Sequence, residues 1–148
     1  MVVSESKSPY DLDNALGFWL HITFNKLRAE SERRMAKYGV TPEQWALLVR
    51  LWQKDDRTQT ELAGSTFRDK PSVTRMLDGL ERAGYIVRAR HLEDGRSHRI
   101  LLTEAGRALQ HHLVPLVVGI TQEVGQGIPR RDLETTLSTL KAMYQNLG

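Results

Sequence analysis

The 148-residue sequence contains no cysteine. This absence excludes disulfides, cysteine-thiolate zinc sites and cysteine-based redox sensing, and it fits a cytoplasmic protein. Long apolar runs are absent too: no stretch approaches the roughly 18 apolar residues of a membrane span. The longest apolar cluster, 113–120, is interrupted by Pro115 and Gly119. The N-terminus lacks the apolar core of a signal peptide.

The sequence also lacks the residue patterns that form the active sites of most enzymes. There is no paired nucleophile and base, no glycine-rich phosphate loop and no cluster of metal ligands. His111 and His112 are adjacent, so on a helix their side chains point about 100° apart and do not chelate together. His21, His91 and His98 have no ligand spacing either. We therefore expect no catalytic activity, no metal and no cofactor.

The overall composition is that of an ordinary globular protein, with 40% hydrophobic and 26% charged residues. The formal net charge is +3 and the isoelectric point is about 9.4. This excess of positive charge favours an anionic partner but does not establish one.

The stretch 69–83 carries the most specific pattern. Asp69 is a typical helix N-cap, and Pro71 stands where its missing N–H costs nothing. Val73, Leu77 and Leu80 recur at helical spacing, so they predict a buried stripe. The other faces carry Lys70, Ser72, Thr74 and Arg75, residue types that hydrogen-bond base edges and phosphates.

Two capping boxes and a hairpin surround this helix. Thr41 to Gln44 and Thr58 to Glu61 each predict a helix start, and Phe67, in the turn before residue 69, is expected to point inward. The short helix after Thr58, the turn and the helix 69–83 make a helix-turn-helix. Residues 85–90 and 97–102 alternate as strands around an Asp-Gly turn, which predicts a β-hairpin wing with a basic tip.

Three segments together resemble the MarR family of winged-helix regulators. They are T-Q-T-E-L-A (58–63), D-K-P-S-V-T-R-M-L-D-G-L-E-R-A-G-Y-I (69–86) and D-G-R-S-H-R-I-L-L-T-E-A-G (94–106). The resemblance implies a mainly α fold with a small β-wing, a winged helix-turn-helix lobe over 41–103, and dimerisation helices over 1–40 and 104–148. The implied function is a sequence-specific transcriptional regulator, commonly a repressor that releases its pseudo-palindromic operator on binding a small phenolic or aromatic compound.

The resemblance also assigns roles to residues. Ser72, Thr74 and Arg75 match the base-reading positions, and Asp94 matches the residue that orients Arg96 into the minor groove; Gly95 departs from the basic or bulky residue often found there. The complete set of predicted DNA contacts is Thr58, Lys70, Ser72, Thr74, Arg75, Arg88, Arg90, Asp94, Arg96, His98 and Arg99.

The terminal helices predict a two-fold homodimer independently of the resemblance. A heptad-like seam runs along 130–146, and the first helix, expected over 10–38, is apolar on more than one side. The predicted contacts are Leu12, Leu16, Leu133, Leu137, Leu140 and Tyr144. A monomer whose terminal helices pack on each other is the alternative.

Four aromatic residues could line a pocket for an aromatic ligand: Trp19, Phe24, Trp45 and Trp52. The alternative interpretation is that these aromatic side chains belong to the core. A winged-helix module that binds DNA or protein without ligand control therefore stays open beside the ligand-responsive repressor.

Overall fold

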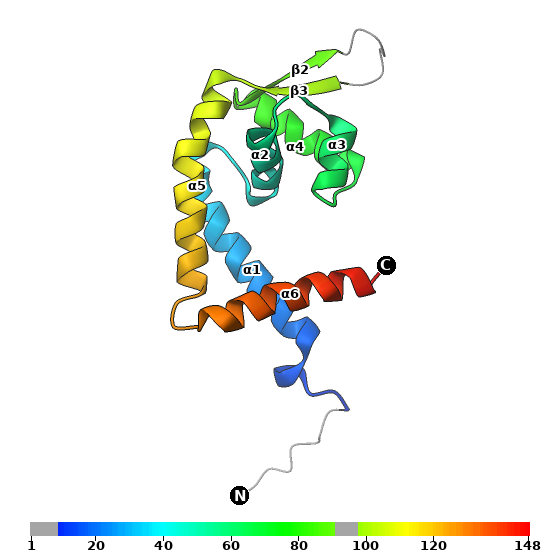
Figure 1. Ribbon diagram of the computed structural model, residues 1–148, viewed down its shortest axis with the longest axis vertical. Helices are drawn as coiled ribbons and strands as arrows, with labels where there is room; N and C mark the ends of the chain where they lie inside the picture. The colour runs from blue at the N-terminus through cyan, green and yellow to red at the C-terminus, as the bar shows by residue number, and fades with distance from the viewer. Residues whose placement is uncertain (1–8, 91–97) are drawn as a thin grey trace, which may run out of the picture. The chain divides into compact units, whose positions relative to one another are not determined.

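The computed structural model describes residues 9–90 and 98–148, and the predicted wing tip with Asp94 and Arg96 lies outside these ranges. The chain is mainly helical with one small antiparallel sheet (Figure 1). Its elements are η1 (Leu12–Asn14), α1 (Leu16–Met35), η2 (Ala36–Tyr38), α2 (Pro42–Gln53), β1 (Arg57–Thr58), α3 (Gln59–Ser65), α4 (Lys70–Arg82), β2 (Ile86–Arg90), β3 (His98–Leu102), α5 (Glu104–Val124) and α6 (Arg130–Asn146).

The chain divides by packing into two compact units, Met1–Arg107 and Ala108–Gly148. The first unit holds α1 together with the helix-turn-helix and the sheet. The sequence interpretation instead grouped residues 1–40 with the C-terminal helices by their expected role in dimerisation. That grouping by role stays a prediction.

The first helix is shorter than the sequence suggested. Ala15 adopts an extended conformation, with φ −84° and ψ 125°, and separates η1 from α1. The last residues of the expected helix form the 3-10 turn η2. Gly39 then ends the segment with φ +70°, a left-handed conformation that glycine adopts without steric cost.

Side-chain caps start the next three helices, as predicted. Thr41 accepts a hydrogen bond from the backbone N–H of Gln44, whose side chain in turn accepts from the Thr41 backbone N–H, which completes a capping box. Thr58 accepts from the Glu61 N–H and Asp69 from the Ser72 N–H. Because each cap satisfies helix N–H groups that would otherwise lack a partner, these starts are fixed locally.

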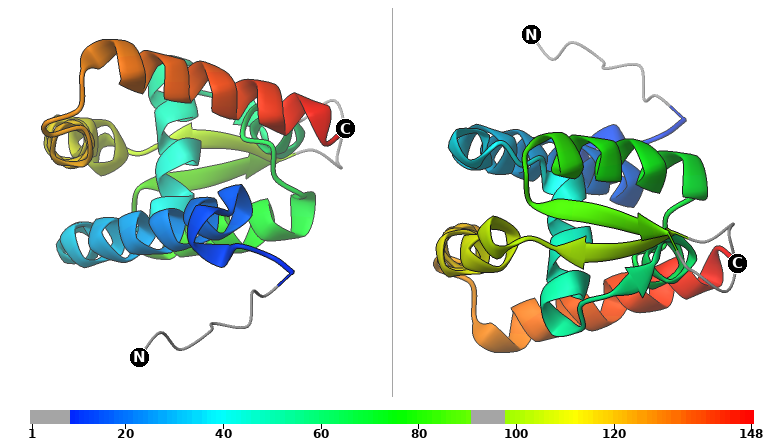
Figure 2. Two further views of the ribbon diagram at one scale, coloured as in Figure 1. Left: turned by 90° about the horizontal axis from the view of Figure 1, so that it is seen from below. Right: turned by 90° about the horizontal axis from the view of Figure 1, so that it is seen from above.

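The sheet has one strand more than the predicted hairpin. β2 and β3 pair antiparallel with Ile86 opposite Leu102, and they run side by side in Figure 2. The two-residue strand β1 pairs with the other edge of β3, with Arg57 opposite Ile100, to give the order β1-β3-β2. A strand of two residues is too short to show an alternating pattern, which explains why the sequence did not reveal it.

The predicted stripe of α4 lies in the core of the first unit. Val73, Leu77 and Leu80 are completely buried, as are leucines of α2 and α3 and Ile100 of β3. The prediction for Phe67 is wrong: its side chain is 73% exposed, in the turn between α3 and α4, and its φ is +58°. A left-handed turn conformation fixes the direction of this residue independently of its hydrophobicity.

The second unit contains most of α5 and all of α6. α6 has no buried residue, although Leu133, Leu137, Leu140 and Tyr144 recur along it and are 38–59% exposed. Among residues 9–90 and 98–148, no helix is long and apolar enough to cross a bilayer.

Candidate nucleic-acid interface

The N-terminus of α4 is organised by a chain of three side chains. The Asp69 carboxylate accepts from the Ser72 N–H at 2.9 Å and from the Ser72 hydroxyl at 2.8 Å. Arg75 Nη2 donates to the same hydroxyl oxygen at 3.2 Å. The hydrogen bonds from the Ser72 backbone and hydroxyl lower the pKa of Asp69 below 3.8. Ser72 therefore orients the Arg75 guanidinium while its own hydroxyl proton is committed to Asp69.

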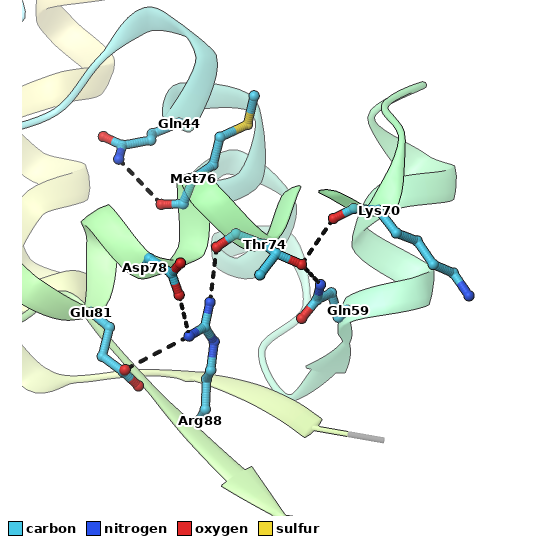
Figure 3. A network of polar contacts seen from close by, with 8 residues as sticks. All are labelled: Gln44, Gln59, Lys70, Thr74, Met76, Asp78, Glu81 and Arg88. Atoms are coloured by element: carbon cyan, nitrogen blue, oxygen red, sulfur yellow. Dashed lines mark hydrogen bonds and ion pairs between the residues drawn. The ribbon is translucent and has the colours of Figure 1, made fainter. Parts of the chain in front are cut away.

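The same end of α4 presents positive charge to solvent. Lys70 and Arg75 are both exposed, and the ammonium of Lys70 points away from its polar neighbours (Figure 3). The α4 dipole adds a partial positive charge at this end, although the Asp69 cap binds the Ser72 N–H. An anionic chain such as a phosphodiester backbone fits this combination.

A second chain of hydrogen bonds joins α4 to the start of α3. The Thr74 hydroxyl donates to the Lys70 carbonyl at 2.9 Å, and Gln59 Nε2 donates to the Thr74 hydroxyl oxygen (Figure 3). Gln59 was not among the predicted DNA contacts. No sequence signal links it to a partner fifteen residues away in another helix.

Arg88 on β2 faces α4. Its Nη1 lies 2.6 Å from Asp78 Oδ1 and 3.8 Å from Glu81 Oε1, and its Nη2 donates to the Thr74 carbonyl at 3.1 Å (Figure 3). The side chain is only 19% exposed, and Nε is buried without a hydrogen-bond partner. Arg88 therefore fastens the hairpin to α4, and the predicted contact with a DNA phosphate would compete with these bonds.

Arg99 on β3 is held in a similar way. Its Nε donates to Asp56 Oδ1 at 2.6 Å and its Nη2 to the Asp56 carbonyl at 2.9 Å. The hydrogen bond that Arg99 donates to the Asp56 carboxylate is the main reason that the pKa of Arg99 is raised. Asp56 has a φ of +59° and lies directly before β1. The Asp56–Arg99 pair therefore anchors β1 to β3.

The remaining predicted contacts differ in their surroundings. Thr58 is engaged as the cap of α3, with its hydroxyl oxygen 3.1 Å from the Glu61 nitrogen. His98 on β3 is exposed and lies opposite Arg90 on β2. The pair Asp94 and Arg96 falls outside the described residues, so its roles in the wing stay predictions.

Gln44 connects α2 to α4 beneath this surface. The residue is 7% exposed, and its Oε1 accepts from the Thr41 N–H at 2.9 Å. Its Nε2 donates to the Met76 carbonyl at 3.2 Å (Figure 3). A Cβ on Gly79 would lie 2.5 Å from that Nε2, so a larger residue there would have to displace the Gln44 amide. Gln44 was predicted only as a capping residue.

The aromatic residues proposed as ligand contacts fall into two groups. Trp45 and Trp52 are half-buried on α2 with ring centroids 5.6 Å apart, and Trp52 Nε1 donates to the Gly106 carbonyl at 2.9 Å. Trp19 and Phe24 on α1 are 53% and 60% exposed. The contacts of the α2 pair fit the interpretation of these tryptophans as core residues.

Residues 40–98, which hold the helix-turn-helix and most of the sheet, match the MarR family model. The organic hydroperoxide resistance transcriptional regulator of Bacillus subtilis (strain 168) is 29% identical over 132 residues, 87% of this chain and 88% of that protein. Over these residues the chain resembles the MarR family. The relatives that it resembles are transcriptional regulators and not enzymes.

Solved MarR-type structures share the fold over nearly the whole chain. The transcriptional repressor CouR, solved with a 23-mer DNA duplex, is 29% identical with a TM-score of 0.82, covering 93% of this chain and 99% of that one. A probable transcriptional regulator from Pseudomonas aeruginosa is 27% identical with a TM-score of 0.83, covering 90% and 99%. The predicted mainly α fold with a small β-wing and a winged helix-turn-helix is therefore confirmed.

Proposed function

We propose that this chain is a MarR-type regulator that binds a pseudo-palindromic DNA operator as a two-fold homodimer and represses transcription. The carrying observation is the solvent face of α4, where Lys70, Thr74 and Arg75 are exposed over a completely buried stripe. A helix with this division presents donors and acceptors to the base edges of the major groove. CouR, a relative of comparable length, is a repressor and was solved on DNA.

The homodimer rests on α6. A helix of 17 residues with no buried residue gains little from packing within this chain, and tertiary packing is the main source of helix stability in proteins. Its exposed apolar residues recur as a seam, and Leu12, Leu16 and Phe24 add exposed apolar surface on the N-terminal segment. A two-fold axis buries such surfaces against their own copies. It also places two copies of α4 on DNA, about 34–36 Å apart.

Control by a small aromatic compound is the finer part of the proposal. Such a compound can release DNA only if it binds the DNA-free state more tightly than the DNA-bound state. Trp19, Phe24, Trp45 and Trp52 are the proposed contacts. The Bacillus subtilis relative is named for resistance to organic hydroperoxides. In this chain a hydroperoxide could not be sensed by oxidising a cysteine thiol, because none of the 148 residues is a cysteine.

The test combines oligomeric state with DNA site selection. The purified chain should be a dimer by light scattering and should select duplexes with two inverted half-sites. Leu137→Glu with Leu140→Glu should yield a monomer with strongly reduced operator affinity. Thr135→Glu with Ser138→Glu adds the same charge to the opposite face of α6 and serves as the matched control. A leucine double variant that stays dimeric contradicts the seam.

The ligand is tested on the selected duplex. A panel of aromatic acids, titrated against the preformed complex, should contain compounds that release the DNA. If no compound changes the affinity, the alternative of a regulator without ligand control is favoured.

A further inference from the structure

The hydrogen bonds around Thr74 determine which end of the Gln59 side-chain amide, at the start of α3, faces Thr74. A threonine hydroxyl has one proton, and Thr74 donates it to the Lys70 carbonyl at 2.9 Å. Toward Gln59 the hydroxyl oxygen is therefore an acceptor, so it faces the amide nitrogen of Gln59 and not the amide oxygen. One Nε2 hydrogen of Gln59 is consumed in this contact.

What remains of the Gln59 amide is one N–H donor and the carbonyl acceptor. Adenine presents the complementary pair in the major groove, an acceptor at N7 and a donor at N6, and a glutamine amide binds both at once. Guanine presents two acceptors in the same place, and thymine an acceptor and a methyl group. A Gln59 amide in this orientation therefore favours adenine.

The support for this amide is rigid. Thr74 is β-branched and follows the buried Val73 on α4, and its carbonyl accepts a hydrogen bond from Arg88 at 3.1 Å. Both the side chain and the backbone of Thr74 are thus held in place, and the contact lies on the exposed side of the helix (Figure 3). An amide that is oriented before binding loses less conformational entropy when it meets a base.

We infer that Gln59 reads an adenine in each half-site and that Thr74 is the positioning residue that orients its amide. This inference rests on the proposed DNA-binding function and adds to it a specificity-determining residue, a positioning partner and a base. In this arrangement the Thr74 hydroxyl binds Gln59, and the Thr74 methyl group is left to face solvent or DNA.

The test measures base preference in variants of the full chain. Site selection with the wild type defines the half-site, and affinities are then measured for the selected duplex and for duplexes with each adenine replaced in turn. At one adenine the wild type should discriminate by about 5- to 150-fold. Gln59→Met, which keeps the length of the side chain and removes its amide, should reduce this ratio to near one at that position alone.

Two variants of Thr74 separate positioning from direct contact. Thr74→Val removes the hydroxyl and keeps the methyl group, so it should relax the same adenine. Thr74→Ser keeps the hydroxyl and should retain the preference. Adding Thr74→Val to Gln59→Met should cause little further relaxation, because the two residues act through one contact. Unchanged thermal unfolding would show that these exposed substitutions leave the fold intact.

Other results overturn the inference. If Gln59→Met weakens all duplexes equally, Gln59 contacts the phosphate backbone. If the position read is guanine or thymine, the amide has the opposite orientation, and if Thr74→Ser loses the preference while Thr74→Val keeps it, the methyl group does the reading. Failure of the wild type to select any sequence overturns the proposed function itself, whereas a selected site that is insensitive to Gln59 overturns only this inference.

Discussion

Gly79→Ala is a sensitive probe of how α4 is held, because its effect should change sign with the residue at position 44. The new Cβ would lie 2.5 Å from Gln44 Nε2, closer than non-bonded atoms come. The Gln44 amide must then move and lose its bond to the Met76 carbonyl. Gln44 is 7% exposed, so the displaced amide has little access to water.

The magnitude follows from two opposing effects. A buried polar group left without its partner costs about 1–3 kcal/mol. Replacing glycine by alanine inside a helix gains about 1 kcal/mol in helix propensity. The free energy of unfolding should therefore fall by about 0–2 kcal/mol in the otherwise unchanged chain.

In a Gln44→Ala background the same substitution should be stabilising. Alanine at position 44 ends at Cβ, so nothing opposes the new methyl group and only the propensity gain of about 1 kcal/mol remains. The difference between the two backgrounds, about 1–3 kcal/mol, is the coupling energy of the contact. Gly64→Ala is the matched control, because no atom lies within 4 Å of the Cβ it would create in α3.

Urea unfolding followed by circular dichroism measures these differences. The chain concentration must be equal in all samples, since the apparent stability of a dimer depends on concentration. If Gly79→Ala stabilises both backgrounds equally, α2 and α4 are not in close contact at Gln44, and the proposed support of α4 fails.

Three further predictions concern α4 and the residues that contact it. Arg88→Ala should lower the free energy of unfolding by about 1–2 kcal/mol and leave the salt dependence of DNA binding unchanged, because the guanidinium binds Asp78 and the Thr74 carbonyl; a flatter salt dependence would instead indicate a phosphate contact. Arg75→Ala should relax base preference at one position per half-site, by about 1–3 kcal/mol in competition between duplexes. Asp69 has a lowered pKa, so its stabilising effect is complete above pH 3.8 and declines as the pH falls through the lower folded value. Acid titration of the unfolding free energy, compared with Asp69→Asn, checks this direction.

The sequence predicted those parts of the fold that are encoded locally. Thr41, Thr58 and Asp69 cap helices through atoms three residues away, so their side-chain chemistry alone marks each start. The stripe of Val73, Leu77 and Leu80 follows from helical periodicity and is buried as expected. Recognition of the winged helix-turn-helix followed from the order of such local signals.

The parts that escaped prediction depend on contacts between distant segments. Strand β1 exists because β3, more than forty residues later in the chain, offers a free edge, and Asp56 secures it by binding Arg99 across a separation of 43 residues. Arg88 looked like a surface cation because its partners, Asp78 and the Thr74 carbonyl, lie on another element. Periodicity and propensity carry no information about such pairs.

These long-range contacts bear on how a signal could act. α4 is held from α2 by Gln44, from β2 by Arg88 and at its own N-terminus by Asp69, so within the first unit it has little freedom to turn. A change in DNA affinity is then most readily achieved by altering the separation of two rigid recognition helices across the proposed dimer axis. Variants of the contacts that hold α4 should therefore change which base is preferred at a fixed half-site spacing. Variants of the α6 seam should change the tolerated spacing and leave the preferred bases unaltered.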